Sequence, residues 1–181
     1  MNPTVDLRLV TMMRALQDVI LPALANNGFA ADQAKLMLGH LNMLRLQVDD
    51  VAYFEQLELR AARDLAARLV AAVDGGDETH HAVSALKAAL ALGGGHPREV
   101  RASRDAINGA IDTLVQAAST DGSADFLAEA QRLVIRGGTE SANRNRSFFA
   151  ASGFEGDGGD IPAIADMLAD FARAYPEPAR G

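Results

Sequence analysis

The chain has 181 residues, enough for one domain with a core of its own, and 49% of them are hydrophobic. Its formal net charge of −7 argues against a nucleic-acid surface or an anionic membrane surface as the main function. The chain contains no cysteine, so neither disulfide bonds nor thiolate chemistry are available to it. Aromatic residues make up only 5%, and a core built instead from Leu, Ala, Val, Ile and Met favours helices over strands.

The N-terminal sequence gives no sign of export. Residues 1–4 lack the basic and apolar regions of a signal peptide. No apolar run reaches the roughly 18 residues that a membrane-spanning helix needs. We therefore expect a cytoplasmic protein without a membrane segment.

A first helix is predicted from about residue 4 to residue 25, with Thr4 as its N-cap. Pro22 falls late in this helix. Because Pro22 has no backbone N–H and its ring clashes with the carbonyl of Asp18, a kink or an early break is expected there. Residues 26–28 then predict a turn.

The longest helical pattern covers residues 32–73, and we expect the rest of the chain to pack around it. Its apolar residues recur every three or four positions, which places them on one face of a helix. Asp32 is the expected N-cap, and Leu44 and Leu65 are expected core residues. The apolar residues of this pattern are Ala34, Met37, Leu41, Leu44, Val48, Val51, Phe54, Leu57, Ala61, Leu65, Leu69 and Val73.

Asp49 and Asp50 interrupt the apolar rhythm in the middle of this pattern. Buried together, two carboxylates would raise each other's pKa and mark a functional site. Charged residues on long helices are more often solvated, so the pattern favours a solvated face or a local break. The sequence leaves open whether the helix is continuous across residues 47–50.

Further helices are predicted at residues 78–92, from Pro97 to about residue 119, and from Ser123 onward. Gly137-Gly138 is expected to interrupt the last of these, with Thr139 capping a shorter helix up to residue 149. No segment alternates with period two, so no strand is predicted. The sequence therefore predicts an all-α bundle of six or seven helices without a β-sheet.

The expected domain organisation is a single domain in three parts. Residues 1–152 form the helical bundle, and residues 153–159 form a Gly-rich tether. Residues 160–176 form a C-terminal helix, which Asp160 caps and which docks either on its own bundle, the favoured site, or on a neighbouring subunit. Its apolar face consists of Ile161, Ile164, Leu168, Phe171 and Tyr175.

No metal, cofactor or catalytic site is predicted. The metal sites of helical bundles repeat a Glu with a His three residues later, and here only Glu78 and His81 have that spacing. The sequence shows no Ser/His/Asp triad, no Gly-rich nucleotide motif and no paired catalytic carboxylates. His80 and His81 are expected to be surface residues in the first turn of a helix, and His40 has no acidic partner on its own helix face.

One stretch suggests a weak anion site. A Gly-Gly-Thr turn before a helix presents free backbone N–H groups, and neighbouring arginines add positive charge. The predicted ligand-binding residues are Arg136, Gly137, Gly138, Thr139 and Arg144. The stretch lacks the strand and the lysine of a phosphate loop, so a simple turn with an N-cap is the favoured explanation.

Arg98, Arg101 and Arg104 form a second basic stripe, near the start of a predicted helix. Positive charge is unfavourable at that end of the helix dipole. These arginines are therefore either solvated or paired with the acid of a partner.

The segment Leu16-Gln17-Asp18-Val19-Ile20-Leu21-Pro22-Ala23-Leu24, within residues 7–44, resembles a small bacterial family of helical proteins. Members of that family have no assigned function and are often encoded beside acyl-CoA dehydrogenases and aminoglycoside-phosphotransferase-like kinases. The resemblance implies an accessory helical protein near acyl-group metabolism. The family has no agreed catalytic residues, so it implies none here.

Three functions are compatible with this sequence. The first is a non-catalytic helical interaction or accessory module that self-associates as a homodimer and contacts another protein. The second is a helical pocket for a small anionic or acyl ligand. The third, an enzyme, is the least favoured, because no acid–base or nucleophile arrangement is readable.

Overall fold

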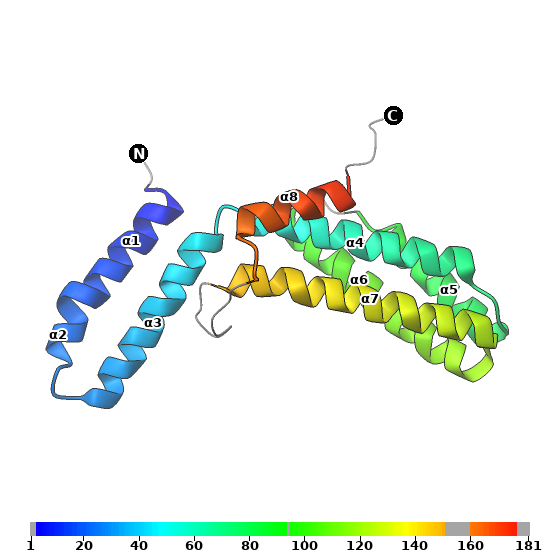
Figure 1. Ribbon diagram of the computed structural model, residues 1–181, viewed down its shortest axis with the longest axis horizontal. Coiled ribbons are helices and arrows are strands. Elements are labelled where there is room, and N and C mark those ends of the chain that lie inside the picture. The colour runs from blue at the N-terminus through cyan, green and yellow to red at the C-terminus, as the bar shows by residue number, and fades with distance from the viewer. Residues whose placement is uncertain (1–2, 94, 151–159, 177–181) are drawn as a thin grey trace. The chain divides into compact units, whose positions relative to one another are not determined.

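The computed structural model describes residues 3–93, 95–150 and 160–176. Within these residues the secondary structure is helical, and the only β pairing is an isolated bridge between Gly75 and Gly122. The predicted all-α class is therefore confirmed. In chain order, the elements are α1 (Val5–Ala15), the π-helix η1 (Leu16–Ile20), α2 (Leu21–Ala23), α3 (Gly28–Gln47), α4 (Val51–Ala72), α5 (Asp77–Leu90), α6 (Pro97–Asp121), α7 (Ala124–Phe149) and α8 (Ile164–Ala174) (Figure 1).

The first helix begins and bends where the sequence indicates. The Thr4 hydroxyl accepts a hydrogen bond from the Leu7 backbone N–H at 3.2 Å, which confirms the predicted N-cap. Just before Pro22 the helix widens into η1, where the Leu21 N–H bonds the carbonyl of Leu16, five residues back. A π-turn lets the backbone accommodate a proline that cannot make the ordinary helical bond.

The predicted long helix over residues 32–73 is two helices, α3 and α4, separated by a turn at residues 48–50. Asp49 and Asp50 explain the break. Negative charge disfavours the C-terminal end of α3, but it favours the N-terminal end of α4. The local break is thus the correct interpretation of this acidic pair.

The predicted start of this region at Asp32 is wrong. α3 begins at Gly28, because the side chain of Asn27 caps it by accepting a hydrogen bond from the Ala30 N–H at 3.2 Å. Asp32 instead pairs with Lys35 on the exposed surface of the helix.

The chain divides into two compact units. The first comprises Met1–Val51 and Asn145–Ile164, and the second comprises Ala52–Arg144 and Ala165–Gly181. The expected organisation was one domain, with boundaries at residues 152 and 160. The predicted tether at residues 153–159 lies outside the described residues.

The first unit is built on a hairpin, in which α1 and α3 run antiparallel beside each other (Figure 1). Its buried side chains include Leu9 and Leu16 on one arm and Ala34 on the other. At the end of α3, the Gln47 side chain donates a hydrogen bond to the Phe148 carbonyl at 2.5 Å. Leu44, a predicted core residue, is 50% exposed, so that prediction is wrong.

The second unit contains the main core. Leu65, the other predicted core residue, is buried only in part and packs against this core. The buried residues of the core come from α4, α5, α6 and α7: Leu59, Ala62, Ala66, Leu69, Ala82, Val83, Leu86, Val100, Ile107, Ile111, Leu114, Ala118, Phe126, Ala130 and Leu133.

In this unit, α6 and α7 begin at N-terminal signals that lie in the adjacent sequence. Pro97 is the first residue of α6, and the Glu99 side chain accepts a hydrogen bond from the His96 N–H at 3.1 Å. The Ser123 hydroxyl accepts one from the Phe126 N–H at 3.2 Å, at the start of α7.

α5 is capped from a distance. The Asp121 carboxylate, at the end of α6, accepts hydrogen bonds from the Glu78 N–H at 2.8 Å and the Thr79 N–H at 3.0 Å. The Thr79 hydroxyl donates a further bond to it, and together these bonds lower the pKa of Asp121 below its ordinary value. A Cβ on Gly75 would lie 2.8 Å from the Gly122 Cα, so this junction requires glycine.

The C-terminal helix lies along α4 in Figure 1. The Phe171 ring lies 6.2 Å from the Phe54 ring and packs edge-on against Tyr175 at 5.4 Å. The predicted cap at Asp160 is wrong, because α8 begins at Ile164. Pro162 gives the reason, since the residue before a proline disfavours helical backbone.

Candidate functional site

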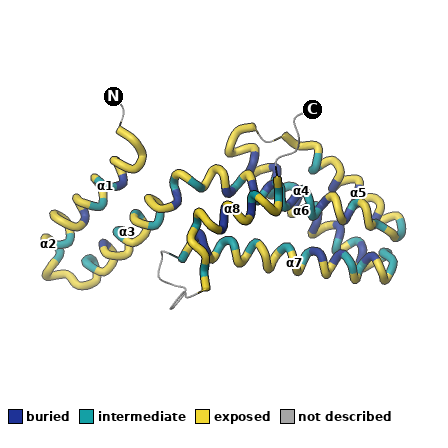
Figure 2. Tube along the Cα trace, turned by 45° about the horizontal axis from the view of Figure 1, so that its top comes forward, coloured by how far each residue is buried: buried dark blue, intermediate teal, exposed yellow. Residues whose placement is uncertain are grey.

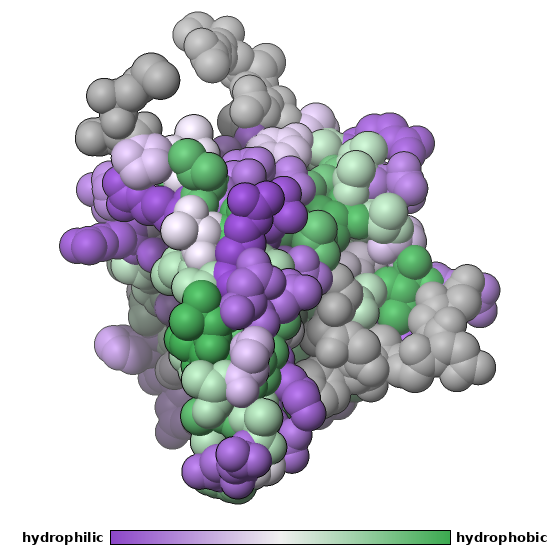
Figure 3. Space-filling view, turned by 90° about the vertical axis from the view of Figure 1, so that its left-hand side faces the viewer, coloured by the Kyte–Doolittle hydropathy of each residue, from purple (hydrophilic) through white to green (hydrophobic). Residues whose placement is uncertain are grey.

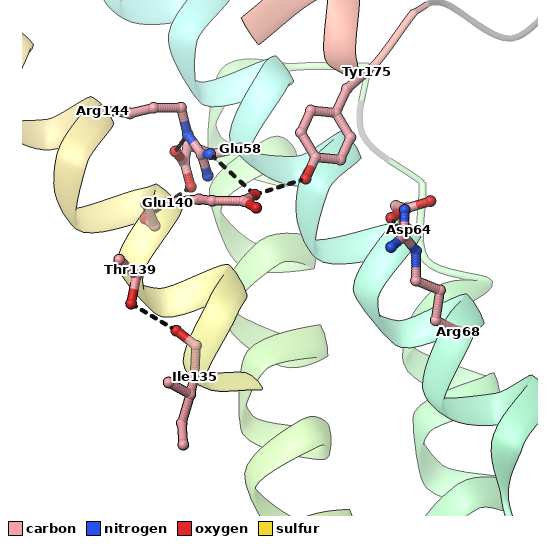
Figure 4. A network of polar contacts seen from close by, with 9 residues as sticks. Glu58, Asp64, Arg68, Ile135, Thr139, Glu140, Arg144 and Tyr175 are labelled. Carbon is pink, nitrogen blue, oxygen red and sulfur yellow. Dashed lines mark hydrogen bonds and ion pairs between the residues drawn. The ribbon is translucent and has the colours of Figure 1, made fainter. Parts of the chain in front are cut away.

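The predicted anion site does not have the expected geometry. α7 runs without a break through Gly137 and Gly138, so the predicted interruption and the separate helix after it are wrong. Thr139 does not cap a helix. Its hydroxyl donates to the Ile135 carbonyl at 2.9 Å, one turn earlier (Figure 4). The backbone N–H groups of this stretch are therefore inside a helix, where they bond preceding carbonyls.

Contacts on both sides of the glycine pair explain why the helix continues. Before it, Ala130 and Leu133 are buried in the core of the second unit. After it, Arg144 is bonded to α4. A Cβ on Gly137 would lie 3.4 Å from the Leu65 side chain, about an ordinary van der Waals contact, so α7 packs close to α4 at this point. Two glycines cost a helix roughly 2 kcal/mol, which packing on either side can offset.

Arg144, a predicted ligand-binding residue, is occupied by acidic groups of its own chain. Its Nε donates to the Glu58 carboxylate at 2.8 Å, and its Nη1 lies 3.9 Å from Glu140. The guanidinium group also stacks over the Phe171 ring, 4.0 Å from its centroid. Arg136 lies on the same helix and is exposed. The structure thus does not bring Arg136 and Arg144 together around one ligand.

The polar network around Arg144 holds the C-terminal helix in place (Figure 4). The Ser141 hydroxyl donates to Glu58 at 3.2 Å, and the Tyr175 hydroxyl donates to Glu140 at 3.3 Å. Burial raises the pKa of Tyr175 above its ordinary value, and the Glu140 charge adds to that effect. Because α4, α7 and the end of α8 all contribute, this cluster is a structural clamp.

Two arginines of the second basic stripe pair with an acidic residue of the same chain. Arg101 and Arg104 on α6 lie 3.6 and 3.5 Å from the two carboxylate oxygens of Glu55 on α4. The sequence left two interpretations open for this stripe, solvation or pairing with a partner's acid. For Arg101 and Arg104 neither applies, because both lie beside a carboxylate of their own chain.

Among residues 3–93, 95–150 and 160–176, no group of three or more His, Asp or Glu side chains is placed to hold a metal ion. His96 has a local role, because its Nδ1 accepts a hydrogen bond from the Arg98 N–H at 3.2 Å. In the part of the chain that the structure describes, every helix is too short or too polar to cross a bilayer.

The strongest functional feature is the apolar surface of the first unit. Fifteen large hydrophobic side chains are exposed among the described residues, and twelve of them belong to this unit. Figure 2 shows α1 and α3 mostly in the colour of exposed residues, and Figure 3, viewed from the α1 side, shows hydrophobic patches between hydrophilic ones. The twelve residues are Val5, Leu7, Met12, Val19, Ile20, Phe29, Leu36, Met37, Leu44, Leu46, Val51 and Phe149.

The number of exposed apolar residues on this unit is high. Single exposed hydrophobic residues are normal, but twelve on one unit indicate surface that is available for binding. On α3 the exposed residues include Leu36 and Met37, neighbours that point about 100° apart around the helix. A helix that is apolar on several sides is usually buried on several sides.

No protein-family model, no curated protein and no solved structure matches this chain. The resemblance of the segment at residues 16–24 to a bacterial helical family therefore stays an expectation. The candidate site rests on the surface described above.

Sequence reasoning singled out the stretch around Gly137 and did not identify the hairpin surface as a site. A signal for it was present. Residues 28–47 carry more apolar residues than one face of a helix can hold, and the single stripe of Ala34, Met37, Leu41 and Leu44 leaves the others, such as Leu36 and Leu46, unexplained.

Proposed function

We propose that this chain is a non-catalytic helical interaction module that self-associates through the hairpin of α1 and α3. The observation that supports it is the concentration of exposed apolar side chains on this unit, compared with the well-covered core of the second unit. The proposal includes a homodimer in the cytoplasm with an accessory role. The absence of cysteine is the sequence feature that supports that location.

The energetics of the hairpin support the same proposal. Two helices alone bury little apolar surface, and helices of this length owe most of their stability to packing. Each half-exposed Leu, Met or Val that becomes covered contributes roughly 1 kcal/mol. A partner that covers several of them thus stabilises the hairpin as well as binding to it.

The alternative function, a helical pocket for an anionic or acyl ligand, has less support. Arg144 would have to give up the Glu58 carboxylate to bind an anion. Gly137 and Gly138 offer helical backbone instead of free N–H groups. No feature of the described residues specifically favours this alternative.

The test is the mass of the purified full chain in solution. Light scattering coupled to size exclusion, at chain concentrations from about 1 to 100 µM, should give twice the mass of one chain in the upper part of the range. The mass should fall towards that of a single chain on dilution. A mass of one chain at every concentration would contradict self-association.

A further inference from the structure

Buried side chains and one ion pair show which residues of α1 and α3 face each other along the seam between the two arms of the hairpin. Leu9 is buried on α1, and Leu41 is half-buried on α3. The Arg45 Nε lies 2.6 Å from the Asp6 carboxylate. Because the arms are antiparallel, this pair places Leu9 and Leu41 at about the same level of the hairpin.

Four exposed apolar residues border this seam with the same spacing on both arms. Val5 lies four residues before Leu9, and Met12 lies three after it. Met37 and Leu44 have the same offsets from Leu41. Two antiparallel helices are related by a local two-fold axis perpendicular to their plane, so equal offsets fall on the same side of the pair.

These four residues therefore form one surface, which we call the seam face: Val5, Met12, Met37 and Leu44. Val5 lies near the level of Leu44, and Met12 near the level of Met37, so the face has two apolar layers. Leu36 and Leu46 point away from this face, because they lie about 100° and 200° around α3 from Met37 and Leu44, respectively.

We infer that the seam face is the self-association site, and that it packs against the seam face of a second copy to complete a four-helix bundle. This inference rests on the proposed function and specifies its partner. In a two-fold interface the same residues serve both copies, which is the usual arrangement of a homodimer. Two hairpins with two apolar layers each then share one core, as in other four-helix bundles.

Charge favours a second copy as the occupant. The whole chain has a formal net charge of −7, but residues 5–47 contain three acidic and four basic side chains. Two such hairpins can approach each other without strong repulsion. Arg8 and His40, each one residue before Leu9 and Leu41, lie at the margin of the seam face, where interfaces are polar.

The seam face supplies the apolar centre of such an interface. Its four side chains together present roughly 300 Å² of apolar surface, at about half of each side chain. A standard protein interface covers about 800 Å² on each partner, of which somewhat more than half is apolar, so the polar margin of the seam face must supply the rest of the contact. The other exposed apolar residues of the hairpin remain available to another helix.

The chain offers two matched pairs of variants to test the face. Met37 and Leu36 are adjacent and 56% and 53% exposed, and Leu44 and Leu46 are 50% and 51% exposed. All four side chains are at the surface, so glutamate at any of them should leave the fold intact, which circular dichroism checks. Met37→Glu and Leu44→Glu should raise the dissociation constant of the dimer about 100-fold or more, since a two-fold dimer loses each contact twice.

Leu36→Glu and Leu46→Glu should change the dissociation constant by less than about tenfold, measured in the same way by sedimentation velocity. Dissociation by these two variants, with the Met37 and Leu44 variants still dimeric, would overturn the seam face but leave self-association standing. A wild-type chain that is monomeric throughout would instead overturn the proposed function itself.

A mixing experiment tests the two-fold pairing. The pairing that we infer brings like layers together, around a two-fold axis that runs along the bundle, so Met37 of one copy lies beside Met37 of the other. Met37→Glu and Met37→Lys should then each be monomeric, and an equimolar mixture should recover a dimer through the opposite charges. If both variants are monomeric and the mixture stays monomeric, Met37 does not meet Met37 of the second copy, and this pairing of like layers is wrong.

Discussion

Arg144 and Glu58 face each other with side chains that are only 13% and 11% exposed. A partly buried ion pair of this kind contributes little compared with a well-packed apolar pair, but breaking it leaves one charge without its partner. Arg144 also covers the Phe171 ring, so its removal loosens the contact with α8. Its role is therefore to hold three segments of the second unit together.

Arg144→Ala should lower the free energy of unfolding by about 3 kcal/mol, because Glu58 stays buried without its cation. The matched control is Arg68→Ala, which breaks the pair between Arg68 and Asp64, whose side chains are 55% and 41% exposed. That change should cost about 1 kcal/mol or less. Urea unfolding monitored by circular dichroism measures both. Equal costs for the two variants would mean that Arg144 has no structural role.

At the scale of elements, the continuity of α7 through its glycine pair can be tested by substitution. It contains Gly137 and Gly138 near its middle, and such residues weaken a helix because they have the largest backbone freedom to lose. Nothing lies within 4 Å of the position that a Cβ on Gly138 would take. An alanine therefore fits there without steric cost if the helix is continuous.

Gly138→Ala should raise the free energy of unfolding by roughly 0.5–1 kcal/mol. Gly109→Ala is the matched control, since Gly109 lies inside α6 and also has nothing within 4 Å. Gly122→Ala should have the opposite sign, because its Cβ would come 2.6 Å from the Ala118 carbonyl oxygen. Thermal melting of the three variants is the measurement. A lower melting temperature for Gly138→Ala alone would indicate a turn at this position.

At the scale of the whole molecule, the two units differ in how well they cover their apolar residues. The second unit has a contiguous core from α4, α5, α6 and α7. The first unit leaves about half of its large apolar side chains exposed. Local stability follows buried contacts, so the hairpin should open more readily than the second unit.

Amide hydrogen exchange should therefore be faster in α1 and α3 than in α4 and α6. It should also depend on concentration. Dilution from about 100 µM to 1 µM should speed exchange in α1 and α3, because dissociation removes the protection that a partner gives, and should leave α6 unchanged. Mass spectrometry of peptic fragments measures both segments in one experiment. Exchange in α1 and α3 that is slow at every concentration would contradict a dependence on the partner.

Several features of this chain can be read from a few adjacent residues. Thr4 and Ser123 cap the helices that follow them, and Pro97 begins one. Pro22 distorts the first helix, as its missing N–H requires. Each of these signals acts within about one helical turn, so the sequence carries all the information needed. The same holds for the all-α class, which follows from composition and periodicity.

The other features depend on residues that meet only after folding. The cap of α5 comes from Asp121, 43 residues from the N–H group of Glu78, and Arg144 bonds a carboxylate 86 residues away. Such partners cannot be read from periodicity, which shows which side of a helix is apolar and does not show what covers it. For the same reason the apolar stripe predicts a core position for Leu44, although in the folded chain Leu44 lies on the open surface of the hairpin.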